Sequence, residues 1–342
     1  MNLPRTGALP ALAARWADRG LHRAPRVRYT AIVPCLPRGL QLPGDNPLPF
    51  FPDLGHILTA RAAAAQKAMP TIRLTLAYEG TEFVGWQRQR NGLSVQEVLE
   101  TALHKVTGQA VACRAAGRTD SGVHALGQVV TFRLGAAADD AAAATAGGAE
   151  APPPPGRPVS LRALVHGTNY HLPPAIRVLD AQLVPDEFDA RFSASGKLYR
   201  YQLWNAPTES PLHARTHWHI IARLDLAAMH TAAQVLVGHH DFRAFRAASC
   251  ERLTTDRTVR RIAVSAQGPY PAPIHIDVEA TAFLRNMVRI LAGTLVYVGR
   301  GKLSAADVAA LLRSGDRTRA GPTAPAHGLI LWRVDYGPRD GV

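Results

Sequence analysis

The chain has 342 residues, 47% of them hydrophobic, which suffices for a sizeable core in one large domain or two ordinary ones. No apolar run reaches the roughly 18 residues that a membrane-spanning helix needs, and three widely separated cysteines argue against a disulfide framework or a cysteine-based zinc site. The net charge of +13 favours a polyanionic partner, because Lys and Arg release counterions when they neutralise phosphates.

The first 68 residues differ in composition from the rest of the chain. They are rich in Pro, Ala and Arg, have no sustained period, and carry nine basic residues and three Asp, which leaves +7 for the remainder. We interpret them as a disordered extension, or as a stretch upstream of a true start at Met69. A targeting peptide is the alternative, but this stretch lacks the serines typical of transit peptides.

The N-terminal half of the globular part, residues 69–192, begins with a strand predicted by alternating apolar residues over 72–78. Ser94 and Glu97 form a capping-box pattern, and the apolar residues over 95–106 have helical spacing. Another strand is expected over 128–134. Residues 135–158, with Ala runs and four consecutive prolines, predict an exposed low-complexity insertion.

The C-terminal half, residues 193–338, mixes strands and helices in the same way. Strands are predicted around 198–204, 274–280 and 330–336, and helices after Asp225, over 284–298 and after Ser304. Alternating strands favour a largely antiparallel α+β fold over a parallel doubly wound sheet. We expect two similar halves with a cleft between them.

The segment from Ala116 to Ala125, AGRTDSGVHA, is the most informative for chemistry. Two glycines flank an Arg-Thr-Asp-Ser core, which predicts a tight loop that displays the carboxylate of Asp120. Arg118 lies two residues away, and a neighbouring cation favours the ionised form of a carboxylate. An Asp that only caps a turn explains the same pattern, so the chemistry of the loop leaves both interpretations open.

The order of further motifs resembles the tRNA pseudouridine synthase A family. G-R-T-D-x-G-V-H-A is similar to the nucleophile loop of that family. The other matching segments are LAYEG at 76–80, GWQ at 85–87, SVQE at 94–97, FDARF at 188–192, KLYRY at 197–201, GPY at 268–270, FLRNMVR at 283–289 and TAPAHGL at 323–329. The resemblance spans roughly residues 71–336 in the expected order; Glu79, where the family commonly has Asp, and the 135–158 insertion depart from it.

The resemblance implies a pseudouridine synthase fold with a central RNA-binding cleft, and an isomerase that needs neither cofactor nor metal. Asp120 is the implied nucleophile, with either C1′ of the ribose or C6 of the base as its target. Arg289 is expected to pair with Asp120, and Tyr199 to stack on the flipped uridine; a core aromatic on a strand is the alternative for Tyr199. Arg118 is expected to organise Asp120 or to contact the nucleotide.

We expect Arg285 to lie one helical turn before Arg289 on the same face and to contact phosphate, unless it is a solvated surface residue. His239, His240 and Asp241 do not predict a metal site, because adjacent side chains diverge and no further ligand is recognisable.

The implied substrate is tRNA, at uridines 38–40 of the anticodon stem–loop, and the implied enzyme is a cytoplasmic homodimer. A catalytically silent RNA-binding relative is the alternative function. A hydrolase or sugar-transfer enzyme built on Asp120 is a third, but it requires a second carboxylate as the acid, and none is recognisable.

Overall fold

The computed structural model describes residues 71–134, 159–248 and 253–337 of the chain. All of them belong to one of the two units into which the chain divides, Ala63–Val342. The predictions for residues 1–68 and for the 135–158 insertion lie outside the described residues.

One mixed sheet runs through the described residues, in the strand order β4-β1-β3-β10-β5-β9-β8-β7. The strands along this path are β1 (Thr71–Tyr78), β3 (His124–Arg133), β4 (Ile176–Val184), β5 (Gly196–Asn205), β7 (Gly238–Asp241), β8 (Asp256–Ala266), β9 (Ala272–Ala280) and β10 (Leu329–Asp335). Neighbours on this path pair antiparallel except β10 with β3, and the short β6 (Trp218–Ile220) also pairs parallel, with β5. The expected α+β fold with largely antiparallel strands is confirmed.

In the first half, local sequence accounts for the elements closely. The alternating residues of β1 are buried as predicted, with Leu74 and Leu76 fully inaccessible. Helix α2 (Val95–Thr107) begins after Ser94, whose hydroxyl accepts from the Glu97 amide. The predicted capping box is only half formed, because the Glu97 side chain does not accept from the Ser94 amide. Helix α3 (Leu161–His171) was not predicted. Only Leu164 and Thr168 are buried on it, so its apolar period is weak.

The helices of the second half are α4 (Leu226–Gln234), α5 (Met287–Gly299) and α6 (Ala305–Ser314). Asp225 caps α4, and Ser304 and Asp307 form a complete capping box on α6, as expected from the sequence. Helix α5 starts three residues later than the predicted 284. Asn286, with a φ of 61°, adopts the left-handed conformation, which a continuous helix does not allow.

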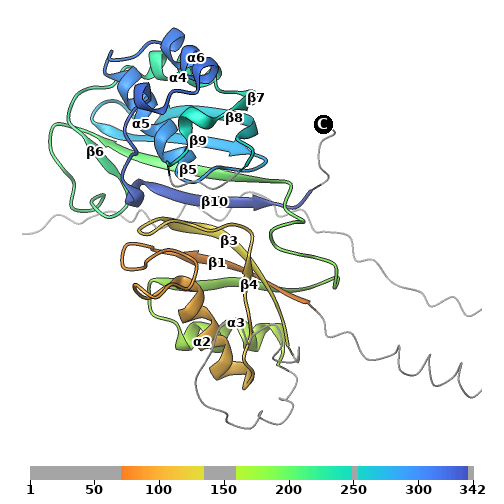
Figure 1. Ribbon diagram of the computed structural model, residues 1–342. Helices are drawn as coiled ribbons and strands as arrows, with labels where there is room; N and C mark the ends of the chain where they lie inside the picture. The colour runs from red at the N-terminus through yellow and green to blue at the C-terminus, as the bar shows by residue number, and fades with distance from the viewer. Residues whose placement is uncertain (1–70, 135–158, 249–252, 338–342) are drawn as a thin grey trace, which may run out of the picture. The chain divides into compact units, whose positions relative to one another are not determined.

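Strand β10 joins the two halves, because it comes from the end of the chain and lies between β3 and β5 (Figure 1). Helices α2 and α3 lie on the side of β1 and β4, and α4, α5 and α6 lie beyond β10 on the side of β5 to β9 (Figure 1). The loop before β3 and the first residues of β5 therefore approach each other across β10. The predicted catalytic residues lie in this region.

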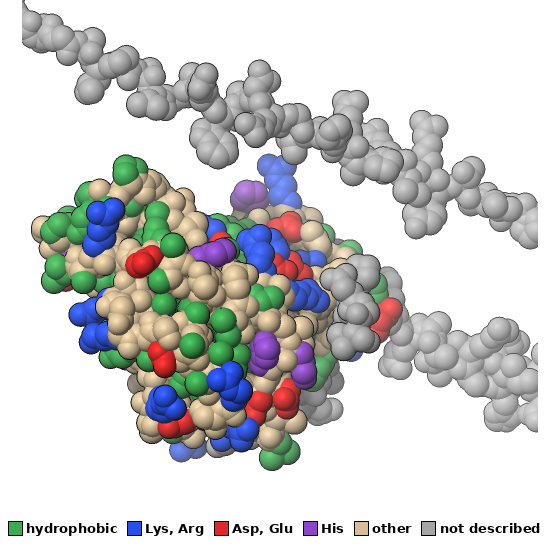
Figure 2. All heavy atoms as spheres, turned by 90° about the horizontal axis from the view of Figure 1, so that it is seen from above, with side chains coloured by type: hydrophobic (Ala, Val, Ile, Leu, Met, Phe, Trp, Pro, Cys, Tyr) green, Lys and Arg blue, Asp and Glu red, His purple; other side chains and the backbone are tan. Residues whose placement is uncertain are grey.

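None of the helices in the described ranges combines the length and the hydrophobicity needed to cross a lipid bilayer. On the face seen from above, Lys and Arg side chains are dispersed and have Asp and Glu among them (Figure 2). The net positive charge thus does not gather into a single basic patch on that face.

Candidate active site

The loop that carries Asp120 is fixed to the turn after β1. The carbonyl oxygen of Thr119 accepts from the Trp86 amide at 3.1 Å, and the Ser121 hydroxyl donates to the Phe83 carbonyl at 3.1 Å. Gly85 has a φ of 111°, and a Cβ there would lie 2.7 Å from the Thr119 oxygen. The close approach of the two backbones therefore requires glycine at this position.

A buried polar network supports the same loop from beneath. The Tyr78 hydroxyl and the Thr119 hydroxyl are 2.8 Å apart, and the Gln128 amide donates to the Gly117 carbonyl at 2.8 Å. Burial raises the pKa of Tyr78 to about 12, so this hydroxyl stays protonated near neutral pH. Because buried hydrogen bonds of this kind are costly to lose, they hold the loop in one conformation.

His124, at the start of β3, connects the loop to two distant segments. Its Nδ1 accepts from the Gly80 amide at 2.9 Å. Its Nε2 therefore carries the proton and donates to the carbonyl oxygens of Arg215 and His327, at 3.0 and 2.9 Å. Burial lowers the pKa of His124, which favours this neutral form. The sequence analysis did not identify this role, since it depends on contacts 91 and 203 residues away.

The structure brings Asp120 and Arg289 together, although they are 169 positions apart in the chain. The Asp120 carboxylate is 35% exposed, and its Oδ2 lies 3.9 Å from a guanidinium nitrogen of Arg289, which is 17% exposed. Arg289 also donates to the Ala324 carbonyl at 2.7 Å and to the Asn286 side-chain oxygen at 3.1 Å. An immobilised cation thus faces an accessible carboxylate, a little beyond hydrogen-bonding distance.

Asn286 is a second residue that the sequence analysis missed. Its left-handed backbone starts α5, and its side chain orients Arg289. A non-glycine residue with positive φ is uncommon and often marks a functional position. Sequence offers only a weak signal for this, the known tolerance of Asn for the left-handed region.

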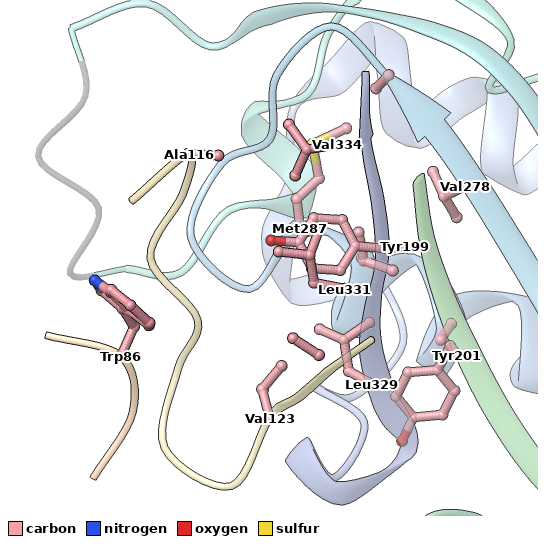
Figure 3. Packing of buried hydrophobic residues seen from close by; sticks show 14 of the residues in the cluster. Trp86, Ala116, Val123, Tyr199, Tyr201, Val278, Met287, Leu329, Leu331 and Val334 are labelled. Atoms are coloured by element: carbon pink, nitrogen blue, oxygen red, sulfur yellow. The ribbon is translucent and has the colours of Figure 1, made fainter. Parts of the chain in front are cut away.

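Tyr199 is placed close to Asp120 but is largely covered. It is 7% exposed and packs edge-on against Phe283, with ring centroids 5.0 Å apart. Burial, with Tyr78 and Asp120 nearby, raises the pKa of Tyr199 far above its usual value. Figure 3 shows Tyr199 beside Met287 and Leu331, with its hydroxyl turned toward the side on which Val123 lies. Little of the ring surface is therefore exposed for a base to stack on.

Arg118 and Arg285 are both exposed, and neither side chain has a hydrogen bond or ion pair within the described part of the chain. The expected placement of Arg285 on the helix with Arg289 is wrong. Arg285 precedes Asn286, where the backbone turns left-handed, so it lies in the loop before α5 rather than one turn earlier on its face.

Two further features lie away from Asp120. Among the described residues, no group of three or more His, Cys, Asp or Glu side chains is arranged to hold a metal ion. His239 contacts the Thr258 hydroxyl, and His240 the Val237 carbonyl. A cavity of about 630 Å³ lies between the start of α4 and the β8–β9 turn, with Arg223 and Tyr270 in its wall, and none of the predicted site residues lines it.

Comparison with known proteins gives a consistent result. A family model described as tRNA pseudouridine synthase matches residues 75–151 and 232–337. A tRNA pseudouridine synthase A from Syntrophotalea carbinolica is 46% identical over 272 residues, which is 80% of this chain and 98% of that protein. Proteins of the same name from Myxococcus xanthus and Beijerinckia indica are 47% and 46% identical, again over 80% of this chain and over 94% and 96% of their own lengths. The chain therefore belongs to the tRNA pseudouridine synthase family, and it is an isomerase of that family.

Proposed function

We propose that the protein converts uridine to pseudouridine in tRNA, at positions 38–40 of the anticodon stem–loop, with Asp120 as the nucleophile. The observation that carries this proposal is the accessible Asp120 carboxylate in a loop fixed by buried hydrogen bonds, 3.9 Å from the guanidinium of Arg289. Family membership supplies the substrate class, since the relatives are named for tRNA.

The reaction exchanges one bond to the ribose for another. The C1′–N1 bond breaks, the uracil rotates, a C1′–C5 bond forms, and the proton that leaves C5 is balanced by one gained at N1. No atom or electron is gained or lost overall. A carboxylate at Asp120 provides the nucleophile that the first step needs, and the partly covered site limits competition from water.

The neighbouring residues have distinct proposed roles. Arg289 holds the Asp120 carboxylate in position by charge attraction, because its own guanidinium is anchored by Ala324 and Asn286. Tyr199 contacts the uracil after the nucleotide leaves its stack, which costs a few kcal/mol that aromatic contact partly offsets. Arg118 contacts the nucleotide, and Arg285 a phosphate, since both side chains are exposed, Arg118 two residues from Asp120 and Arg285 next to Asn286, which holds Arg289.

We further propose that the enzyme is a cytoplasmic homodimer that binds one tRNA across two subunits. The charge of +7 outside residues 1–68 suits an extended phosphate track. Light scattering at micromolar concentration should give twice the monomer mass of 36.8 kDa. A fully active monomer would contradict this part of the proposal.

The function itself is tested by incubating the protein with unmodified tRNA and mapping pseudouridine at single-nucleotide resolution. We expect new pseudouridine at positions 38–40 and nowhere else in the anticodon arm. Modification confined to other positions would overturn the assigned target, and no modification at all would overturn the activity.

A further inference from the structure

Lys197 differs from the other lysines in the described part of the chain. It is half-buried on β5, whereas Lys105 and Lys302 are exposed. Its stem is covered, but its ammonium group still reaches solvent and has neither a hydrogen bond nor an ion pair with any described residue. A lysine with a packed stem and an unpaired ammonium group that reaches solvent is placed to bind an anion from outside the protein.

The surroundings of Lys197 belong to the candidate active site. A Cβ added to Gly117, three residues before Asp120, would lie 3.2 Å from Lys197 Cε and 3.9 Å from its Nζ. The lysine stem therefore packs directly on the loop that carries Asp120. On β5, Lys197 precedes Tyr199 by two residues and thus shares its face of the sheet, roughly 7 Å away along the strand.

The charges near Lys197 also indicate a binding site for an anion. Burial lowers the pKa of Lys197, and repulsion from the positive charge of Arg191 lowers it further. Arg191, itself exposed, lies within the family-like segment at 188–192. Two cations close together beside the nucleophile loop, with no described acid acting on Lys197, leave a place for an anion that the protein does not supply.

We propose that Lys197 is a substrate-binding residue that contacts a phosphate of the nucleotide bound at Asp120. The proposal rests on the proposed function, because it takes RNA as the source of the anion. A lysine binds phosphate as a point charge, and the separation from Tyr199 is comparable with the reach from a base to the phosphates of its own nucleotide. Strand β5 is paired with β9 and β10 on either side at this position, so the backbone that carries Lys197 is held in place by the sheet.

Salt dependence of binding separates a phosphate contact from a packing role. Each phosphate contact makes the plot of log affinity against log salt steeper by roughly one unit. We therefore expect Lys197→Met to bind unmodified tRNA about tenfold more weakly at low KCl and to lower the slope by roughly one unit. The melting temperature should change little, since Met keeps most of the packed stem and the ammonium group that it removes has no partner among the described residues.

Two matched variants complete the experiment. Lys197→Arg keeps the charge and should restore the slope. Lys105→Met removes an equal charge from the exposed surface of α2 and should leave the slope unchanged. A wild-type slope and affinity in Lys197→Met, or an equal change in Lys105→Met, would overturn the assignment of Lys197. If the wild-type protein forms no pseudouridine, the proposed function fails instead, so the two failures are distinguishable.

Discussion

The nucleophile loop and the cations around it differ in how many contacts they make within the protein. Asp120 lies in a loop whose backbone and neighbouring side chains are hydrogen-bonded to Tyr78 of β1, to the Trp86 amide and, through His124, to the Arg215 and His327 carbonyls. The side chains of Arg118, Arg285 and Lys197 have no hydrogen bond or ion pair within the described residues.

This difference separates geometry that must exist before the substrate arrives from contacts that form only with it. A nucleophile is effective when its position is fixed in advance, because reorganisation during the reaction is then avoided. A phosphate-binding cation gains most when its partner is on the RNA, since an internal ion pair would first have to break. Arg289 shares features of both groups: it is a cation, like the proposed RNA-binding residues, but protein contacts fix its position, as they fix the loop of Asp120.

The largest effect among the neighbours of Asp120 is expected for Arg289→Ala. The substitution removes the fixed charge 3.9 Å from the carboxylate, and we expect single-turnover pseudouridine formation to fall by about 10²–10³. Arg300→Ala, at an exposed position just after α5, is the matched control and should keep the wild-type rate. A loss of less than about fivefold in Arg289→Ala would place Arg289 with the RNA-binding cations instead.

Gly85→Ala tests whether the close backbone contact between Gly85 and Thr119 holds the nucleophile loop in place. The added methyl group would clash with the Thr119 carbonyl in a left-handed backbone, so we expect a loss of roughly 1–3 kcal/mol in stability together with lower kcat. Gly108→Ala is the control, because Gly108 is also left-handed, with a φ of 70°, but has nothing within 4 Å of an added Cβ. Equal melting temperatures and equal activities for the two variants would show that the contact with Gly85 does not matter.

Arg118→Ala, unlike Gly85→Ala, should weaken tRNA binding without lowering stability. Because the side chain is exposed and has no described partner, the melting temperature should not change, while KM for tRNA should rise by up to about tenfold. Arg162→Ala, on the exposed surface of α3, should change neither quantity. A fall in kcat at unchanged KM would instead assign Arg118 to organising Asp120.

The smallest effect concerns the histidines that connect segments to the loop. His327 donates to the His217 carbonyl at 3.0 Å, and burial, followed by His213, His275 and His327, lowers the pKa of His217 to about 4. Because the unfolded chain binds the proton near pH 6.5, stability from this group is full above that pH and declines as pH falls toward 4. His217→Gln should flatten the fall of melting temperature between pH 6.5 and 4, and exposed His230→Gln should not. Parallel curves for wild type and His217→Gln would contradict this.

The sequence predicted elements best where one face is buried and an end is capped. The alternation in β1 and the caps of α2, α4 and α6 are local signals, and the structure agrees with them. Strand β4 was missed because it is an edge strand with exposed apolar residues such as Leu179 and Leu183. In β10, Ile330 and Val334 are buried as the period predicted. Leu331 is buried as well and Trp332 only half-buried, because this central strand is covered on both faces and a bulge between Leu331 and Arg333 shifts its pairing.

In the site, too, features that depend on neighbouring residues were predicted from the sequence, and features that depend on distant residues were not. The tight loop around Asp120 follows from its two glycines, but only family resemblance suggested Arg289 as its partner, because no local rule connects residues 169 positions apart. The contacts of His124 and the packing of Lys197 on Gly117 depend on the folded sheet. Arg285 was misplaced because the apolar pattern of α5 continues upstream of Asn286, where the backbone does not.

Asp120→Asn tests the central claim most directly, when tRNA affinity by filter binding and single-turnover pseudouridine yield are measured on the same preparation. The substitution keeps the size of the side chain but removes the attacking charge. Affinity should stay within a few-fold of wild type, because it comes from phosphate contacts and stacking spread over many residues, while yield should fall to background. Asp180→Asn, at an exposed position on β4, should retain both. A yield within about tenfold of wild type in Asp120→Asn would show that Asp120 is not the nucleophile.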